Sequence, residues 1–458
     1  MNNNVYKKIC LSVAGICCMT AFNSHAANWL MLQGTEPESA ADRVKVWGFI
    51  QAQYQHNNSE SNSSGGYIPP KLIGPNLTNQ DQFNVNRARI GVRGTGFPLD
   101  GKVNYFLLTE FGNNGITAVD GGTAHVTDAS ITLNQIPGAR IRIGLFKTPG
   151  AEEGLQAIHV FDYINFTAVT NQMLLERFPN PGYSSNIAPI TLPTTTPLSG
   201  FDKPVGAFRD VGIQVFDTFK QPGWEHSYAV MIGNGNGLNF GDNDDNKDLY
   251  LYWSSEAVEG GKGGRREGLK MFAWTQQGTR VLDNTNDSVA NPVEFNRDRS
   301  GLGVKWLSKP FRITAEYMVG KGMIFVGPDK PSFYINDAAG AVAAGVGDGA
   351  NGEANGYYLE GGYYIPNTKW EIDLRYDVYN RLSDDKAFPG GANAGKSFEM
   401  EFKNLTLGAQ YHINKKTRIN MEITDASAEA VDWAGGAGPN DNLDGVDQVY
   451  AVQVTHIF

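Results

Sequence analysis

The stretch YAVQVTHIF, residues 450–458, decides the fold because it alternates up to the last residue of the printed chain. In an extended strand its odd and even positions lie on opposite faces: Tyr450, Val452, Val454, His456 and Phe458 on one, and Ala451, Gln453, Thr455 and Ile457 on the other. A terminal strand recruits other chains unless both of its edges are paired. A closed barrel has no free edge, so we expect residues 447–458 to pair back onto the segment near 44–55.

The same alternation recurs in segments of about ten residues, separated by alternately short and long connections, as in an outer-membrane β-barrel. In residues 83–94, for example, Ile90 and Val92 oppose Arg89 and Arg93. The pattern predicts 16 antiparallel strands, at 44–55, 83–94, 101–112, 124–134, 139–147, 205–219, 225–233, 247–256, 267–278, 297–308, 310–320, 355–365, 368–379, 402–413, 416–425 and 447–458. The fold class is therefore all-β, a transmembrane barrel with short turns at one end and long loops at the other.

A soluble β-sandwich is the alternative, since its strands alternate too. Two features favour the barrel: the polar faces carry charges along much of their length, and aromatic residues recur at strand ends as in an interfacial girdle. These aromatic residues are Tyr54, Tyr105, Trp306, Tyr364, Trp370, Tyr379 and Tyr450.

The N-terminus predicts export. Lys7 and Lys8 precede a short apolar run, and small residues end at Ala26, which is the pattern of a cleaved signal peptide, residues 1–26. The expected mature domain, residues 27–458, then contains no cysteine, because all three cysteines precede the cleavage site. This excludes disulfides and thiolate metal sites from the mature chain.

Composition narrows the function further. Without Lys7 and Lys8 the chain has 36 basic and 48 acidic residues, a net charge of −12, so we expect no nucleic-acid partner. Beyond the signal peptide, no apolar stretch approaches the length of about 18 residues that a spanning helix needs.

The longest connection, about 148–204, follows the fifth strand and contains the apolar stretches AIHVFDYINF and QMLLERF. A solvated loop of this size is unusual in a compact protein. We therefore expect it to fold into the lumen as a constriction loop that includes Glu152, Glu153, Glu176 and Arg177.

Five blocks resemble the phosphate-selective porin O/P family, over a region from about Asn86 to the C-terminus. They are RIRIGLFKTPGAEEG (140–154), QMLLERF (172–178), RDVGIQVF (209–216), MIGNGNGLN followed by DNDDNKDLYLY (231–252), and GYYLEGGYYIPNTKWEIDLRYD (356–377). The resemblance implies a homotrimeric 16-strand channel in the outer membrane, with an inward third loop. It also implies anion passage along lumen arginines, with a lysine, here Lys147, near the constriction.

Side-chain parity places a set of basic residues inside the barrel, where guanidinium groups suit phosphate. With Lys147 they form the predicted pore-lining, anion-binding set: Arg87, Arg89, Arg93, Arg140, Arg142, Lys147, Arg297, Arg299 and Lys305. The alternative is that these side chains pair with lumen carboxylates and stabilise the wall.

The same parity places Glu316, Glu371, Asp373, Asp377 and Glu422 inside the late strands. The lumen is therefore expected to have a basic and an acidic sector. The long loop has two basic residues, Arg177 and Lys203, against five acidic ones, which departs from a phosphate filter.

No motif indicates an enzyme, a metal site or a cofactor. Neither Gly-x-Ser-x-Gly nor His-Glu-x-x-His occurs. The acidic run at 242–248 has Lys247 where an EF-hand loop requires glycine, so a solvated loop is the simpler interpretation.

The sequence thus predicts a bacterial outer-membrane porin that passes small hydrophilic solutes, with preference for anions such as phosphate. Its expected partners are two further copies of itself, outer-membrane lipid and small anions. Three alternatives stay open: a general or cation-preferring porin, a sugar channel, and a sleeve that holds a partner such as an electron-transfer cytochrome. A sleeve needs an unobstructed bore, whereas a porin needs a constriction.

Overall fold

The computed structural model describes residues 29–31, 33, 35, 43–59, 81–96, 101–114, 116–117, 124–175, 208–238, 241–242, 245–260, 265–282, 293–324, 352–384, 399–431 and 446–458. The expected signal peptide, residues 1–26, lies outside this range, so its cleavage stays a prediction. Within these ranges no helix has both the length and the apolar character needed to span a membrane.

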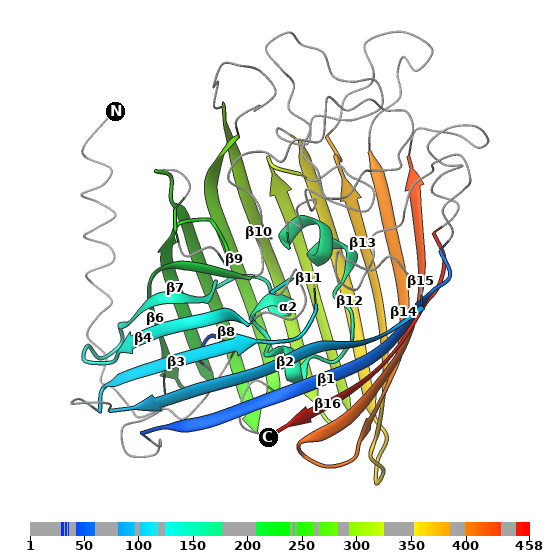
Figure 1. The fold of residues 1–458 in the computed structure, drawn as a ribbon, viewed down its shortest axis with the longest axis horizontal. Coiled ribbons are helices and arrows are strands. Elements are labelled where there is room, and N and C mark those ends of the chain that lie inside the picture. The colour runs from blue at the N-terminus through cyan, green and yellow to red at the C-terminus, as the bar shows by residue number, and fades with distance from the viewer. Residues whose placement is uncertain are drawn as a thin grey trace.

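Sixteen strands form one closed antiparallel barrel in which each strand pairs with its sequence neighbours (Figure 1). The strands are β1 (Lys45–Asn57), β2 (Asp81–Thr95), β3 (Val103–Glu110), β4 (His125–Leu133), β5 (Arg140–Lys147), β6 (Arg209–Gln221), β7 (Trp224–Gly233), β8 (Asp248–Gly260), β9 (Glu267–Leu282), β10 (Val293–Ser308), β11 (Phe311–Lys321), β12 (Glu353–Tyr364), β13 (Trp370–Arg381), β14 (Met400–His412), β15 (Thr417–Ala430) and β16 (Val449–Ile457). The predicted fold class and strand count are confirmed.

The last strand closes the barrel, as its alternation predicts. β16 pairs with β1 from Phe49 opposite Ile457 to Asn57 opposite Val449. Its other edge pairs with β15, where Thr417 lies opposite His456. Both edges of the terminal strand are therefore hydrogen-bonded, and no edge is left to recruit another chain.

The wall is apolar outside and polar inside, the reverse of a soluble sandwich. On β13, Leu374 is 53% exposed on the outer face, whereas its neighbours Asp373 and Arg375 are each 1% exposed on the inner face. Two aromatic assignments were wrong. Tyr364 lies on the inner face of β12 with Tyr358 and Glu360, opposite the inward Glu371. Tyr379 is fully buried against Phe402 instead of lying in an outer girdle, because its odd position on β13 faces inward with Asp373 and Arg375.

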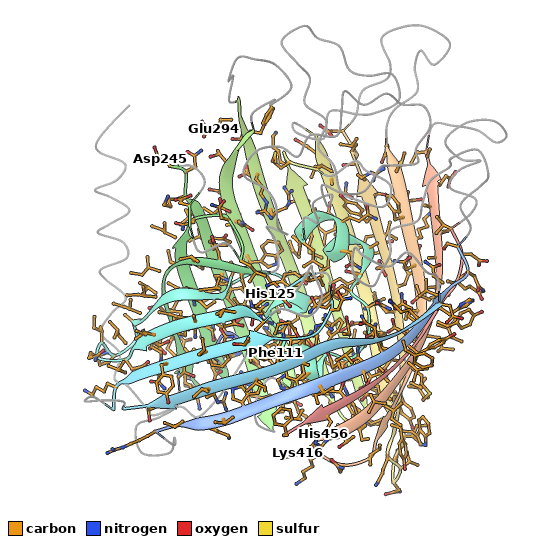
Figure 2. The ribbon with its side chains drawn as sticks, viewed as in Figure 1. Phe111, His125, Asp245, Glu294, Lys416 and His456 are labelled. Atoms are coloured by element: carbon orange, nitrogen blue, oxygen red, sulfur yellow. The ribbon has the colours of Figure 1, made fainter. Side chains whose placement is uncertain are left out.

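The two ends of the barrel differ in their connections. Gly138 and Gly223 each follow a proline in a short turn and have φ of 78° and 81°, the left-handed conformation that a type II turn requires at its third residue. Figure 2 shows Lys416 and His456 at this short-turn end, with Asp245 and Glu294 toward the opposite end.

Several strands differ in length from the predicted ones. β10 begins at Val293 instead of 297, β9 continues to Leu282 instead of 278, and β15 continues to Ala430 instead of 425. Ladder hydrogen bonds join backbone groups, so pairing continues past the point where side-chain alternation fades. Side-chain patterning therefore locates these strands but not their ends.

Candidate functional site: a lumen narrowed by the loop after β5

The first part of the loop after β5 lies inside the barrel. Residues 148–175 form α2 (Glu152–Leu155), the 3-10 helix η2 (Ile158–Val160) and the π-helical turn η3 (Thr170–Leu174). Leu155 and Met173 pack in one apolar cluster with the inward Trp274 of β9. The expected inward fold is confirmed for this part. Residues 176–207, including Glu176 and Arg177, lie outside the described range.

Inward carboxylates of the late strands hold the loop by its backbone. The N–H groups of Glu152, Ile164 and Ala168 donate to Glu316 Oε2 (3.1 Å), Glu422 Oε2 (2.8 Å) and Asp377 Oδ1 (2.7 Å), respectively. Each acceptor is almost fully buried. Three of the acidic residues that parity places in the lumen are therefore occupied in fixing the loop.

Arginines that the prediction left out also lie in the acidic sector. Arg375 of β13 donates to the carbonyl of Asn165 at 3.0 Å and lies 3.5 Å from Glu153. Arg418 of β15 donates to the carbonyl of Phe161 and, at 2.8 Å, to Gln410. Acidic and basic side chains therefore alternate in the predicted acidic sector, where they bind each other and the loop.

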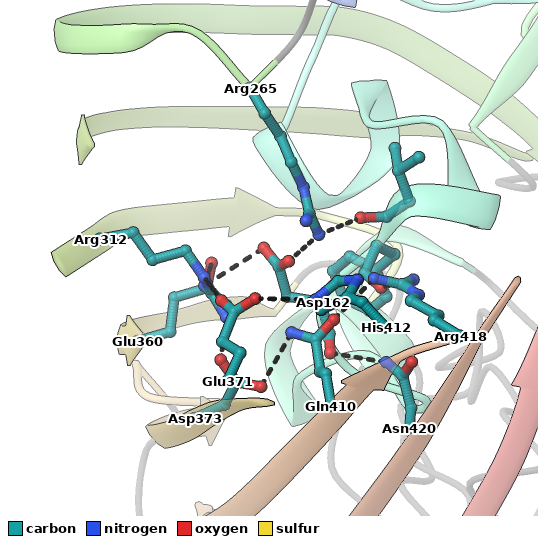
Figure 3. Close-up of polar contacts among 12 residues, drawn as sticks. Asp162, Arg265, Arg312, Glu360, Glu371, Asp373, Gln410, His412, Arg418 and Asn420 are labelled. Carbon is teal, nitrogen blue, oxygen red and sulfur yellow. Dashed lines mark hydrogen bonds and ion pairs between the residues drawn. The ribbon is translucent and has the colours of Figure 1, made fainter. Parts of the chain in front are cut away.

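Asp162 of the loop lies between two arginines of the barrel (Figure 3). Arg265, in the connection between β8 and β9, contacts it directly, and Arg312 of β11 lies 3.2 Å away. Burial alone would raise the pKa of Asp162, but Arg265 and Arg312 hold this pKa below its usual range. Arg312 also pairs with Glu371 at 2.8 Å. The network therefore joins the loop to β11, β13 and the connection between β8 and β9.

The two predicted constriction acids at the start of the loop face partners. Glu152 accepts Lys270 Nζ at 2.6 Å and Lys305 Nζ at 3.3 Å. Glu153 accepts the Thr167 hydroxyl at 2.6 Å. Both acids are nearly fully buried, so they anchor the loop against the wall.

On the opposite side of the loop, four basic side chains line one cavity. The cavity measures about 320 Å³, including space open to solvent, and Arg87, Arg89, Lys147 and Arg209 line it. Glu153 is the single acidic residue among the described lining residues. Three members of the predicted anion-binding set therefore line this cavity: Arg87 and Arg89 of β2 and Lys147 of β5.

The charges around this cavity are compensated unequally. Arg89 lies 2.6 Å from Glu110, and Arg209 lies 3.1 Å from Asp128. Lys147 instead donates to the carbonyl oxygens of Gly154 (2.7 Å) and Gln156 (2.5 Å). Among the described residues, no carboxylate lies within ion-pair distance of the Lys147 ammonium, so its positive charge is not neutralised locally.

The remaining predicted basic residues lie elsewhere in the lumen. Their contacts include the Trp47 ring for Arg93 (5.8 Å to the centroid), Asp217 for Arg140 (3.1 Å), the Gln33 carbonyl for Arg142, Asp248 for Arg297 (3.9 Å), the Met323 carbonyl for Arg299 (2.8 Å) and Glu152 for Lys305 (3.3 Å). The structure therefore spreads this set along the wall and does not assemble it into one site.

A second cavity of about 470 Å³, which also includes open space, lies beside the first. Phe208 and Arg209 line both, and Arg297 lines the second. Sequence reasoning missed Arg209. Arg209 begins the block RDVGIQVF, one of the five blocks that resemble the phosphate-selective porin family. In the pairing of β5 with β6, Arg209 lies directly opposite Lys147, so both residues belong to the same site.

The acidic run at 242–248 is described in part. Lys247 Nζ lies 2.5 Å from Asp242 Oδ2, and residues 243–244 lie outside the described range. Within the described chain, no three His, Cys, Asp or Glu side chains are grouped to hold a metal ion.

Comparison with known proteins identifies the fold. No protein-family model matches the sequence, and no curated protein is significantly similar to it. Among solved structures, an anion-selective porin from Comamonas acidovorans is 12% identical, with a TM-score of 0.50 over 91% of this chain and 99% of that one.

Two further matches have lower TM-scores. The outer-membrane channel DcaP of Acinetobacter baumannii is 13% identical, with a TM-score of 0.48 over 93% of this chain and all of that one. A loop-deletion mutant of OmpT from Vibrio cholerae is 9% identical, with a TM-score of 0.49 over 91% of this chain and all of that one. At these identities the likeness concerns the fold, and the resemblance to the phosphate-selective family stays a prediction.

Proposed function

We propose that this protein is an outer-membrane porin, without enzymatic activity or cofactor, through which small hydrophilic solutes diffuse passively, with preference for anions such as phosphate. One observation carries the proposal: the cavity beside the loop is lined by Arg87, Arg89, Lys147 and Arg209, and the Lys147 charge has no carboxylate partner among the described residues.

Anion preference follows from which charges are already compensated. Among the late-strand carboxylates, Glu371 and Asp373 pair with Arg312, and Asp377 lies 3.9 Å from Arg375, so arginines compensate much of the negative charge there. On the basic side, Glu110 and Asp128 compensate Arg89 and Arg209, and the Lys147 charge is left over. Basic side chains in a narrow pore lower the barrier for anions.

The loop inside the barrel argues against the sleeve hypothesis. A sleeve needs an open bore, but residues 148–175 contact the inner faces of β11, β13 and β15. A general or cation-preferring porin is the second candidate, and the sign of the ion selectivity separates it from the first.

Lipid and subunit contacts belong to the same proposal. The exposed apolar side chains of the outer face, such as Ile143, Leu302 and Leu374, suit a bilayer or a neighbouring barrel. We expect a homotrimer, which chemical cross-linking of the detergent-extracted protein tests directly by the number of chains per particle.

The channel proposal is tested in planar bilayers. Purified protein should give discrete conductance steps in KCl, and added phosphate should reduce the chloride current as it occupies the basic cavity. The absence of any step would refute the channel. Steps without phosphate block would leave a porin that does not bind phosphate.

A further inference from the structure

Residues close to the predicted signal-peptide cleavage site lie inside the barrel. The short 3-10 helix η1 (Trp29–Met31) has all three side chains buried, at 7%, 5% and 5% exposure. They belong to the apolar cluster that contains Leu155 and Met173 of the loop. A water-filled lumen is a costly place for three large apolar side chains unless other apolar groups cover them.

Polar and aromatic contacts tie these residues to distant parts of the wall. Lys305 Nζ of β10 lies 5.6 Å from the Trp29 ring centroid. Gln33 donates to Asp128 Oδ1 of β4 at 3.0 Å, and Arg142 of β5 donates to the Gln33 carbonyl. β4 and β10 are six strands apart in the closed order of 16, so the N-terminal segment (Trp29–Met31 and Gln33) bridges separated walls.

The position of the contacts along the strands gives the depth of the segment. Lys305 lies three residues before the end of β10 at Ser308, where a short turn follows. Arg142 lies two residues after the start of β5, which a short turn precedes. The N-terminal segment therefore lies toward the short-turn end of the lumen.

We propose that the N-terminal segment is a plug, an intramolecular ligand of the lumen that obstructs the path on the short-turn side of the loop. This inference rests on the proposed channel function. The side chains of the plug are uncharged. Trp29, Leu30 and Met31 pack in the apolar cluster with the loop, and the Gln33 amide donates to Asp128 of the wall. Gln33 shares Asp128 with Arg209, so the plug also contacts the charge network of the basic cavity.

The seated position is tested without any measurement of conductance. A Met31→Cys variant in the folded protein is treated with a membrane-impermeant maleimide, with Lys416→Cys in the exposed turn after β14 as the reference. The unmodified protein serves as a blank for any signal-segment cysteine. We expect Met31→Cys to react on the order of tenfold more slowly, because the reaction requires local opening. Equal rates would overturn the plug.

The obstruction itself is tested by single-channel recording. The triple variant Trp29→Ser, Leu30→Ser, Met31→Ser removes the apolar anchor, whereas Leu30→Met with Met31→Leu conserves its volume. We expect the serine variant to raise conductance on the order of twofold, because the segment leaves the bore. The volume-conserving variant should match the parent. Heat-modifiable electrophoretic mobility shows that each barrel is folded.

The outcomes separate the plug from the channel. Equal conductance of the parent and serine variant would refute the plug and leave the channel intact. If no variant conducts, the channel fails, and the maleimide rates alone still decide whether the segment is seated in the lumen.

Discussion

Replacement of Lys147 with glutamine should reduce the preference for anions. The ammonium lies in the cavity with Arg87, Arg89 and Arg209, and its partners are loop carbonyl oxygens. Glutamine keeps an NH₂ group that can donate to the same carbonyls, so the loop retains an anchor. Unlike the removal of Arg89 or Arg209, this change leaves no partner carboxylate uncompensated.

The size of the effect follows from Coulomb's law. An anion about 4 Å from the ammonium gains about 1 kcal/mol in a water-like medium, and about 4 kcal/mol at an effective dielectric constant of about 20. The cavity is partly open to solvent, so the lower figure applies. About 1 kcal/mol corresponds to roughly a fivefold fall in chloride permeability. Potassium loses the repulsion of the same charge, so the chloride-to-potassium permeability ratio should fall by at least about fivefold.

The assay is the zero-current potential across a KCl gradient for Lys147→Gln and the parent. Lys147→Arg keeps the charge and should behave like the parent, and Lys416→Gln removes a lysine from the exposed turn after β14 as a control. A ratio unchanged in Lys147→Gln, or reduced equally in Lys416→Gln, would refute the assignment of Lys147 to the permeation path.

Three further predictions concern the loop and the wall. Glu152→Gln should lower the free energy of unfolding in detergent by about 3–5 kcal/mol, because it leaves Lys270 and Lys305 buried without their carboxylate. The control Glu401→Gln breaks the more exposed pair with Lys403 and should lower this free energy by at most about 1 kcal/mol. Equal losses in the two variants would contradict the anchoring role of Glu152. Leu407→Arg should cost about 2–4 kcal/mol in lipid because Leu407 is 55% exposed on the outer face, and Leu407→Phe should cost little; a tolerated arginine would reverse the face assignment. Burial, reinforced by Arg418, lowers the pKa of His159 to about 3, so the unfolded chain binds a proton below about pH 6.5 that the folded chain does not. Stability should therefore fall as the pH falls, by up to about 2 kcal/mol between pH 7 and pH 5, and His159→Phe should remove this part of the loss; an identical pH dependence in both proteins would show that His159 does not contribute.

The alternation of side chains predicted the barrel because the side-chain period of a strand is set by the backbone alone. Residues 87–93 and 370–377 each gave a correct inner and outer face, and the closing strand paired where expected. A bulge at Asn86 reverses the faces of residues 83–85. Tyr379 was assigned to the girdle because it lies near a strand end, but it faces inward with the other odd positions of β13. Strand ends such as Val293 and Ala430 depend on the partner strand's backbone, which no local pattern encodes.

The candidate site was predictable only in part. Lys147, Arg87 and Arg89 were found by motif and parity, and the structure places them around one cavity. Which charges are compensated depends on contacts between residues far apart in sequence. Asp162 pairs with Arg265 and Arg312, and Asp377 accepts from the Ala168 N–H, because the folded loop lies against the inner wall at the level of these residues. The sequence does not reveal that level.

The position of the N-terminal segment inside the lumen could not be predicted from the sequence either. Its apolar residues follow an apolar signal segment and carry no periodicity of their own. Only the contacts with Asp128 and Lys305 reveal where they bind.

The most direct test of the central claim, that the water-filled path past the loop is basic, is the sign of the zero-current potential of the unmodified protein across a KCl gradient. The uncompensated charge of Lys147 beside three arginines predicts an anion-selective potential, which weakens as the salt concentration rises and screening increases. A cation-selective potential would contradict the account, because it would mean that the buried carboxylates of the late strands set the field in the pore.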